Sequence, residues 1–273
     1  MIDTDAVSER YRAAAFRPVE GRILVTDLRG TEQAQDLSEA PNCGGIGRLR
    51  HFRRETSPGW PQPAAGWAHM SVPRRRPAGR ARAQVFQNAV CNWRCWYCFV
   101  RYNLLAADRR HSRWVTADEI VDLYLREPDP PPVIDLSGGQ PDLTPEWVPW
   151  MMRALRARGL EGRVYLWSDD NLSNDYFWRH LSDAECELVS SFRGYGRVGC
   201  FKGFDPESFA FNTSAAPELF DRQFELMGRL IGTRKQNGGT RWGEDGADEM
   251  CHLRALFASG EKQWDAYWRP HRN

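Results

Sequence analysis

The sequence predicts an α/β fold: a partial, incomplete parallel βα barrel that carries an irregular N-terminal extension. Short apolar segments alternate with segments of helical pattern from residue 84 to residue 205. Strands that are connected through helices pair in parallel, as they do in α/β sheets and barrels. Four of the apolar segments end in polar or glycine-containing turns. Because ligands of such folds bind at the carboxyl ends of the strands, these turns are expected to share one edge of the sheet.

Residues 1–80 form the predicted extension, which we expect to wrap irregularly on the core. Their one apolar run, residues 22–25, is typical of a strand. Stretches rich in glycine and proline follow at residues 42–45 and 58–63, and these residue types interrupt regular structure.

The core is predicted to span residues 81–232, and its first βα unit begins at residues 85–90. This apolar run indicates a strand that leads directly into a cysteine. Thr116 and Glu119 then have the spacing of a capping box, in which two side chains cap the first backbone N–H groups of a helix. We expect that helix to run to about residue 126.

The second unit follows a proline-rich break at residues 128–132. Residues 133–137 are apolar and end in a pair of glycines, which predicts a short buried strand and a turn. A helix is expected next, with Thr144 as its N-cap, proline at its first position and Gly159 at its end.

Two more strands complete the predicted alternation. Residues 163–167 indicate a strand that leads into the polar turn at residues 168–171. Ser182 and Glu185 have the spacing of a second capping box. Residues 197–201 indicate a weaker fourth strand before a Lys-Gly turn.

The C-terminal tail is predicted to be poor in strands. After a helix expected at residues 217–231, residues 233–273 are rich in glycine, arginine and acids and show no pattern of a fifth or sixth strand. A six-unit barrel cannot be completed from this tail. Three alternatives stay open: a shorter barrel, a strand supplied by the N-terminal segment, or a chain end that is altered relative to a working barrel.

Charge and hydropathy restrict the partners of the chain. Its 37 basic and 36 acidic residues leave a net charge of +1, so a nucleic-acid partner is not expected. The local basic run at residues 74–82 is interpreted as a solvated loop, with contact to RNA or a protein as the alternative. The acidic N-terminus argues against a secretory signal, and no run of about 18 apolar residues predicts a membrane span. We therefore expect a cytoplasmic protein without a membrane partner.

Three of the seven cysteines form the motif C-x3-C-x2-C at Cys91, Cys95 and Cys98. Close cysteines in a reducing compartment favour metal binding over disulfides. Three thiolates can hold three irons of a [4Fe–4S] cubane and leave the fourth iron without a protein ligand. The alternative is a zinc site that combines Cys95 and Cys98 with distant ligands such as Cys43 or His111. Zinc sites usually pair two short units, and no second unit is present.

This motif resembles the signature of the radical S-adenosylmethionine (SAM) superfamily. The resemblance implies that the amino and carboxylate groups of SAM chelate the open iron, and that an electron from the cluster cleaves SAM to methionine and a 5′-deoxyadenosyl radical. Members carry an aromatic residue before the third cysteine, close to the adenine, and Tyr97 has that position. The resemblance covers about residues 84–205.

Three turns resemble further motifs of the superfamily. Ser137 to Pro141 is similar to the GGEP motif, whose backbone contacts the amino group of SAM, although Gln140 stands in place of glutamate. Glycine allows the main chain to approach a ligand closely. The turn at residues 168–171 is loosely similar to one near the methionine carboxylate or ribose, and Lys202-Gly203 resembles a segment of the activating enzymes of glycyl-radical enzymes, whose lysine lies near the active site. The resemblance implies one catalytic residue, Lys202, and seven cofactor-binding residues, namely Tyr97, Ser137, Gly138, Gly139, Gln140, Ser168 and Asp170.

The remaining cysteines and two tryptophans are predicted to have supporting roles. Isolated cysteines are usually small buried side chains, with an auxiliary cluster as the alternative. Trp93 and Trp96 are expected to pack over the cluster and exclude water. The four isolated cysteines are Cys43, Cys186, Cys200 and Cys251. Of these, Cys43 is the candidate for lining the site.

The predicted function is that of a radical SAM enzyme whose [4Fe–4S] cluster and SAM start hydrogen abstraction from a protein, peptide or small-molecule substrate. The implied partners are SAM and a reductant such as flavodoxin or ferredoxin. The alternatives are a non-catalytic iron–sulfur or zinc protein and an inactive or truncated member of the superfamily. A structural metal site has no use for a glycine turn placed to meet a ligand, which favours the enzyme.

Overall fold

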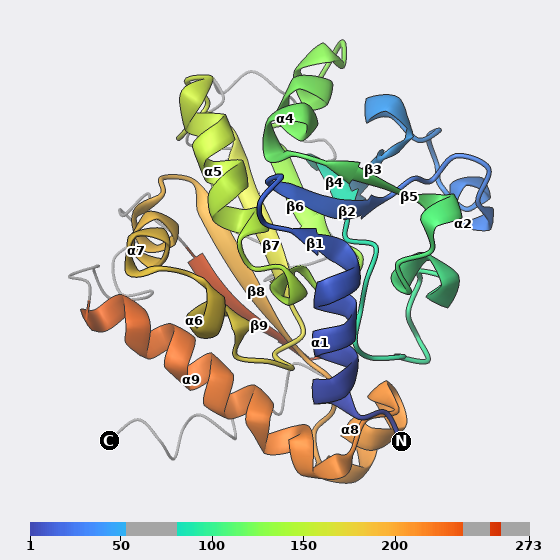
Figure 1. The fold of residues 1–273 in the computed structure, drawn as a ribbon, viewed down its shortest axis with the longest axis vertical. Coiled ribbons are helices and arrows are strands. Elements are labelled where there is room, and N and C mark those ends of the chain that lie inside the picture. Colours follow the sequence, from blue (N-terminus) through green and yellow to red (C-terminus); the bar gives the residue numbers. More distant parts are fainter. Residues whose placement is uncertain (53–80, 237–251, 258–273) are drawn as a thin grey trace.

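The computed structural model describes residues 1–52, 81–236 and 252–257, and their strands form two sheets (Figure 1). The smaller sheet is antiparallel and has the order β1-β2-β5, with β1 at Phe16–Arg17, β2 at Arg22–Thr26 and β5 at Ser112–Val115. The larger sheet has the order β3-β4-β6-β7-β8-β9, with β3 at Gly47–Phe52, β4 at Ala81–Gln87, β6 at Val133–Ser137, β7 at Tyr165–Asp170, β8 at Tyr195–Phe201 and β9 at His252–Phe257.

The six-stranded sheet confirms the predicted α/β class. Strands β4, β6, β7, β8 and β9 are each parallel to their neighbours, and only the edge strand β3 is antiparallel. Among the described strands, β3 and β9 stand at opposite ends of the order without pairing, so they form an open sheet. Each parallel strand is added beside the previous one, and right-handed crossovers then place the connecting helices on one face.

Helices cover that one face of the six-stranded sheet (Figure 1). Short 3-10 turns lie at Cys43–Gly45, Tyr102–Leu105, Arg109–His111, Pro141–Leu143 and Pro217–Leu219. The helices are α1 at Thr4–Ala15, α2 at Glu32–Gln35, α4 at Ala117–Arg126, α5 at Trp147–Ala157, α6 at Tyr176–His180, α7 at Asp183–Ser191, α8 at Pro206–Thr213 and α9 at Phe220–Gln236.

The main core lies between the sheet and these helices. Phe86, Ile134 and Leu166 point from β4, β6 and β7 toward buried residues of α4 and α5 such as Ile120 and Met151. Removal of these side chains from water is the main force that holds the two layers together.

A second, smaller cluster lies on the opposite face of the sheet. It contains Ala83, Val133, Tyr165, Trp167 and Val198, one or two from each of β4, β6, β7 and β8. We call this side of the sheet the far face. Because successive side chains of a strand point to opposite faces, the far face alternates in sequence with the helix-covered face.

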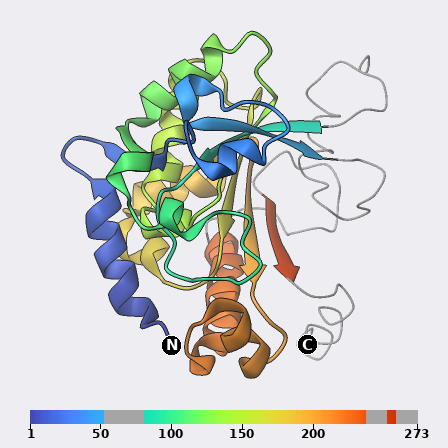
Figure 2. The same ribbon diagram turned by 90° about the vertical axis from the view of Figure 1, so that its right-hand side faces the viewer.

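The prediction of an irregular N-terminal extension was wrong for residues 1–52. They form α1, α2 and three strands, and β3 is the edge of the main sheet. Asp3 caps α1 by accepting a hydrogen bond from the N–H of Ala6, and α1 buries Tyr11 and Ala15. In Figure 2, α1 (dark blue) lies on the same side of the sheet as α4 and α5. The sequence prediction gave weight to the glycines and prolines and overlooked this cap.

The prediction of a strand-poor tail was also wrong in one place, because β9 pairs in parallel with β8 from His252 to Phe257. β9 has His252 and Arg254 among its six residues, so its pattern is a weak strand signal without the neighbouring strand. The two predicted capping boxes are confirmed at Thr116 and Ser182. The helix expected from Thr144 begins later, at Trp147.

None of the helices within the described residues has both the length and the apolar character that crossing a membrane requires.

Candidate functional site

The cysteine motif forms a loop at the carboxyl end of β4, and we call residues 91–98 the Cys loop. Backbone hydrogen bonds fix the point where it begins. The N–H of Cys91 donates to the carbonyl of Leu105 at 3.1 Å, and the N–H of Gln140 donates to the carbonyl of Val90 at 2.8 Å. The glycine turn after β6 and the Cys loop after β4 are therefore joined directly, as expected for neighbouring parallel strands.

Helix α1 holds the Cys loop from the other side. The amide of Asn92 donates to the hydroxyl of Ser8 at 2.9 Å, and the indole N–H of Trp93 donates to the hydroxyl of Thr4 at 3.1 Å. Asn92 and Trp93 are almost fully buried. The N-terminal helix is thus part of the candidate site, which the sequence analysis did not predict.

The three thiols of the Cys loop are half-buried and influence one another. Burial and the neighbouring Cys95 raise the pKa of Cys91 to about 12. Burial also raises the pKa of Cys98. Neutral thiols are poor ligands, so a metal that binds here must displace protons. The side-chain N–H of Asn171 donates a long hydrogen bond to the sulfur of Cys91, with 3.9 Å between nitrogen and sulfur.

This donor set fits an incomplete cubane in its chemistry. Three thiols stand within one eight-residue loop, and Cys95 and Cys98 each pack against a separate apolar cluster that shields one side. Within the described residues, no group of three or more His, Cys, Asp and Glu side chains is already arranged as a metal cage. The three thiols of the Cys loop are therefore the kind of donor set that a [4Fe–4S] cluster takes.

Both glycines of the turn after β6 are required by the packing of the turn. Gly138 has a φ of +83°, a conformation that residues with a side chain rarely adopt. A Cβ on Gly139 would lie 2.5 Å from the carbonyl oxygens of both Asn88 and Val90. The absence of a side chain at Gly139 is thus what lets this turn approach the chain that enters the Cys loop.

Gln140 is buried and uses its side chain within the protein. Its amide donates to Asp170 at 2.9 Å, and its side-chain carbonyl accepts the N–H of Asn171 at 2.9 Å. The side chain therefore joins the turn after β6 to the end of β7. It is not available to bind the amino group of a ligand.

Asp170 belongs to a buried ionic network on the helix-covered face. Arg197 on β8 donates to Asp170 at 2.7 Å and also to Asp142. All three side chains are at least 95% buried. Burial, opposed by Arg197 and supported by the charge of Asp170, raises the pKa of Asp142 to about 7. The network joins β7 and β8 to the 3-10 turn that precedes α5.

Ser168 also faces the helix layer. β7 extends to Asp170, so three of the four residues expected in a polar turn are still part of the strand. The hydroxyl of Ser168 shares a hydrogen bond of 2.7 Å with that of Tyr195. Ser137 and Asp169 point instead to the far face, by the alternation of β6 and β7. Of the predicted residues on β7, Ser168 and Asp170 therefore act in the packing between the layers.

Lys202 and Tyr97 lie together at the edge of the far face. The ammonium of Lys202 is 5.8 Å from the centre of the Tyr97 ring. Burial disfavours the ammonium, but the surrounding groups of Cys200 and Cys95 outweigh it and raise the pKa of Lys202. Burial raises the pKa of Tyr97 to about 12. The structure thus brings the predicted lysine beside the Cys loop.

The remaining predicted residues have mixed outcomes. Trp93 is 1% exposed and packs against Phe209, whereas Trp96 is 64% exposed, so only one of the two is shielded. Cys43 is buried in the main core near Tyr124 of α4 and does not line the site. Cys251 and the basic residues Arg74, Arg75, Arg76 and Arg80 lie outside the described residues.

Several site residues were missed by the sequence analysis. Four of them are polar or charged residues whose side chains are buried, namely Asn92, Asp142, Asn171 and Arg197. Their burial was not visible from the sequence, because polar side chains near strand ends are usually exposed. For Arg197 a signal existed, since an arginine inside a predicted buried strand requires a partner.

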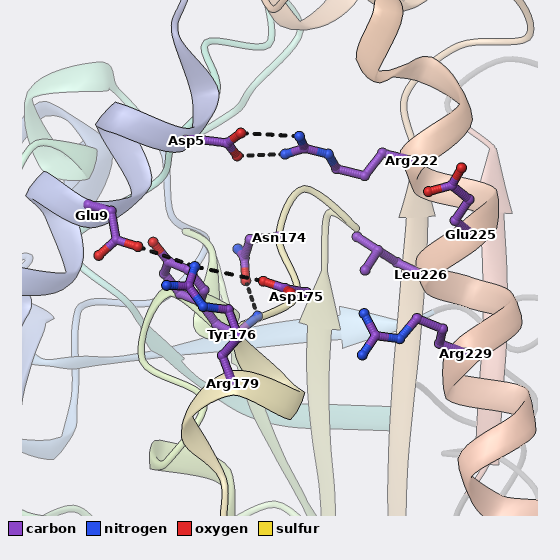
Figure 3. Close-up of a pocket in the computed structure, with 10 residues that line it drawn as sticks. All are labelled: Asp5, Glu9, Asn174, Asp175, Tyr176, Arg179, Arg222, Glu225, Leu226 and Arg229. Atoms are coloured by element: carbon purple, nitrogen blue, oxygen red, sulfur yellow. Dashed lines mark hydrogen bonds and ion pairs between the residues drawn. The ribbon is translucent and has the colours of Figure 1, made fainter.

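A pocket of about 300 Å³ opens elsewhere, where α1, α6 and α9 meet (Figure 3). Four of its charged side chains form ion pairs: Arg222 with Asp5 at 2.6 Å, and Arg179 with Glu9 at 3.3 Å. Arg222 also donates to the carbonyl of Ser173. These ion pairs fasten α9 and α6 to α1, and none of the predicted site residues lines the pocket.

Comparisons with known proteins give only distant similarity. No protein-family model matches the chain, and no curated protein matches it. Two solved structures of SuiB from Streptococcus suis are similar. One, bound to the precursor peptide SuiA, is 15% identical with a TM-score of 0.40 and covers 66% of this chain and 33% of SuiB. The other, bound to S-adenosylmethionine, is 14% identical with a TM-score of 0.41, and the match covers 68% of this chain and 36% of SuiB. This chain thus spans about a third of the SuiB chains, and a similarity this low assigns no function.

Proposed function

We propose that this protein is a radical SAM enzyme that holds a [4Fe–4S] cluster on Cys91, Cys95 and Cys98. The observation that carries the proposal is the Cys loop itself. Three thiols lie in one loop at the carboxyl end of a parallel sheet, beside a glycine turn and without a local fourth ligand. Three protein thiolates leave one iron of a cubane open for a small-molecule ligand.

The cluster would supply one electron that cleaves the sulfonium of SAM to methionine and a 5′-deoxyadenosyl radical, which then takes a hydrogen atom from the substrate. The protein's own residues hold and shield the loop. Trp93 of the loop is buried, and the hydroxyls of Ser8 and Thr4 on α1 accept the hydrogen bonds that keep Asn92 and Trp93 in place. Such shielding limits the access of water to the site.

The glycine turn is the proposed binding site for the amino group of SAM. Gln140 is engaged with Asp170 and Asn171, so the proposal assigns recognition to the main chain. Within the described residues, no backbone N–H donates a hydrogen bond to the carbonyl oxygen of Gly138 or Gly139. Two free carbonyl acceptors at the carboxyl end of β6 suit an ammonium group.

Tyr97 and Lys202 are proposed to lie at the adenine and at the reacting groups, respectively. Tyr97 is 37% exposed and immediately precedes Cys98, so its ring is accessible to a ligand on the cluster. Lys202 approaches the same ring from the end of β8. Ser137 completes the proposed contacts from the end of β6. In this proposal, Ser168 and Asp170 position Gln140 and β8 and do not touch SAM.

A reductant such as flavodoxin or ferredoxin, and a protein, peptide or small-molecule substrate, are the proposed partners. The exposed aromatic side chains of the Cys loop offer a surface for a partner that must approach the cluster. Trp96 and Phe99 are 64% and 65% exposed, and Trp96 is 6.1 Å from Phe211 of α8.

The test is anaerobic reconstitution of the full chain with iron and sulfide, reduction with dithionite, addition of SAM and assay of 5′-deoxyadenosine. We expect four irons per chain and 5′-deoxyadenosine formation, with both lost in Cys95→Ala. Cys186→Ala is the matched control, because Cys186 lies on α7 at the helix layer, and it should behave as wild type.

Two other outcomes would overturn the proposal. A bound cluster that gives no 5′-deoxyadenosine would indicate an electron-transfer or structural protein, or an inactive member of the superfamily. Zinc in place of iron would identify a zinc-binding protein.

A further inference from the structure

The far face of the sheet carries buried charges that the proposed function does not use. On β3 and β4, Arg48 is opposite Val85, and Val85 is in turn opposite Asp135 on β6. Directly paired residues of neighbouring strands point to the same face. Arg48 and Asp135 therefore occupy one row across the far face, two strands apart.

Arg48 is buried without its full set of hydrogen bonds. Arg48 is 5% exposed, yet its Nε and one terminal nitrogen have no hydrogen-bond partner among the described residues. Burial lowers the pKa of Arg48, which the charges of Asp135 and Asp169 partly offset. A buried guanidinium with unpaired N–H groups is costly for a folded protein unless another group supplies the acceptors.

Among the described residues, Asp135 lacks a hydrogen-bond donor for one oxygen, whereas Arg48 lacks acceptors. Asp135 is fully buried, and one of its carboxylate oxygens is 3.4 Å from Arg50, whereas the other has no hydrogen-bond partner in the part of the chain that the structure describes. The far face thus presents unsatisfied donors on Arg48 and an unsatisfied acceptor on Asp135. A simple anion would satisfy Arg48 alone, and a simple cation would satisfy Asp135 alone.

The row is close to the Cys loop. The guanidinium of Arg48 lies 5.0 Å from the centre of the Phe99 ring, and Phe99 directly follows Cys98. Whatever binds to Arg48 is therefore next to the proposed cluster, on the face of the sheet that also holds Lys202.

We infer that Arg48 and Asp135 form a subsite for an amino-acid-like group. Arg48 binds its carboxylate through two N–H groups, and Asp135 accepts a hydrogen bond from its ammonium or amide N–H. This inference deepens the proposed function and rests on it for the role of the group, which belongs to an amino-acid or peptide substrate. The methionine part of SAM carries the same groups, and the second arm of the test separates it from the substrate.

The first arm measures the thermal unfolding of the full chain with glycylglycine, N-acetylglycine or glycinamide, each against sodium chloride at equal ionic strength. A ligand at ten times its Kd should raise Tm by about 3 °C for a chain of this size. We expect glycylglycine to raise Tm, N-acetylglycine to raise it less, and glycinamide, which lacks the carboxylate, to leave it unchanged. No rise in Tm with glycylglycine would overturn the inference.

The second arm measures the Kd of SAM and of decarboxylated SAM. Arg48→Met should abolish the rise in Tm with glycylglycine and leave both Kd values unchanged. If the variant instead weakens the binding of SAM at least tenfold and leaves that of decarboxylated SAM unchanged, Arg48 binds SAM and the inference is overturned. Arg48→Lys should retain part of the effect, because it keeps the charge and loses the paired N–H groups.

The control is Arg153→Met, at an exposed arginine of α5 on the helix side, which should change neither arm. Arg48→Met should fold with an unliganded Tm equal to or above that of wild type, because it removes a buried charge with unpaired donors. An unliganded Tm that falls by more than 5 °C, with binding unchanged in both arms, would show that Arg48 is structural and would overturn the inference.

Failure of this inference and failure of the proposed function can be told apart. The peptide arm needs no cluster, so binding without 5′-deoxyadenosine formation would contradict only the proposed function. Formation of 5′-deoxyadenosine with no effect of Arg48 in either arm would contradict only this inference.

Discussion

At the scale of single residues, the candidate site depends on the missing side chain of Gly139 as much as on the side chain of Gln140. Gly139 brings the turn after β6 against the carbonyls of Asn88 and Val90, where any side chain would collide. Gln140 then connects this turn to the end of β7. The glycines that resemble a ligand-binding motif are thus also required to seat the Cys loop.

We expect Gly139→Ala to lower the free energy of unfolding by about 1–3 kcal/mol, because its Cβ would overpack against two main-chain oxygens. The iron content after reconstitution should fall with it. Urea unfolding and iron analysis check both. Gly228→Ala in α9 is the control, since its Cβ meets nothing within 4 Å, and it should be neutral or stabilising by up to about 1 kcal/mol. Equal stability of the two variants would contradict the role of Gly139.

The buried pair of Asp142 and Asp170 around Arg197 predicts a specific pH dependence. The pKa of Asp142 is raised to about 7 in the folded protein, so the folded chain holds this proton more tightly than the unfolded chain. The associated stabilisation is present below about pH 4 and is lost as the pH rises through 7.

Asp142→Asn cannot ionise, so its stability relative to wild type should increase between pH 4 and 7, by at most about 1.4 kcal/mol per pH unit, and level off above. Urea unfolding of both proteins at pH 5, 6, 7 and 8 measures the difference. A difference that stays constant over this range would show that the proton on Asp142 does not contribute to stability.

At the scale of elements, α1 acts as a clamp on the Cys loop. Three hydrogen bonds run from consecutive residues of the loop to one side of the helix: from Asn92 to Ser8, from Trp93 to Thr4 and from Arg94 to Tyr11, the last at 2.6 Å. In the proposed function these cysteines hold a cluster, and a fixed loop would keep them in place, which makes α1 part of the proposed site.

We expect Ser8→Ala to cost about 1–3 kcal/mol, because it leaves a buried N–H of Asn92 without an acceptor. The half-life of the reconstituted cluster under chelator should shorten as well. Ser191→Ala, at an exposed hydroxyl of α7, is the control and should change stability by no more than about 0.5 kcal/mol. If both variants lose the cluster at the wild-type rate, the clamp does not contribute to its retention.

At the scale of the whole molecule, the two faces of the sheet have different roles. The helix-covered face contains most of the apolar core, whereas the far face combines a small apolar cluster with buried charges near the Cys loop. Stability thus resides mainly on one face, and the proposed ligand contacts lie at the edge and on the other face.

This division predicts an order of local stability. The amides of β6 and β7 lie between paired strands and are buried, so they should exchange hydrogen only on global unfolding. The short helix α2, one turn long, should exchange many times faster. Hydrogen–deuterium exchange followed by mass spectrometry measures both. Exchange of β6 as rapid as that of α2 would contradict this order.

The sequence by itself determined the α/β class, the buried strand at Val133–Ser137, the two capping boxes and the three cysteines of the loop. These are local signals, because the residues that form each feature are neighbours along the chain. Thr116 and Ser182 cap their helices through residues only three positions away, so no distant part of the fold is needed to predict them.

Only the tertiary structure decided the rest. β9 is a strand because β8 supplies its partner, and α1 is part of the site because it packs on residues more than eighty positions away. Likewise, Ser168 and Asp170 face the helix layer because β7 is longer than its apolar pattern suggests. The direction of a side chain on a strand depends on register with its neighbours, and the pairing of buried charges such as Arg197 depends on distant partners. Neither is encoded by the nearby sequence alone.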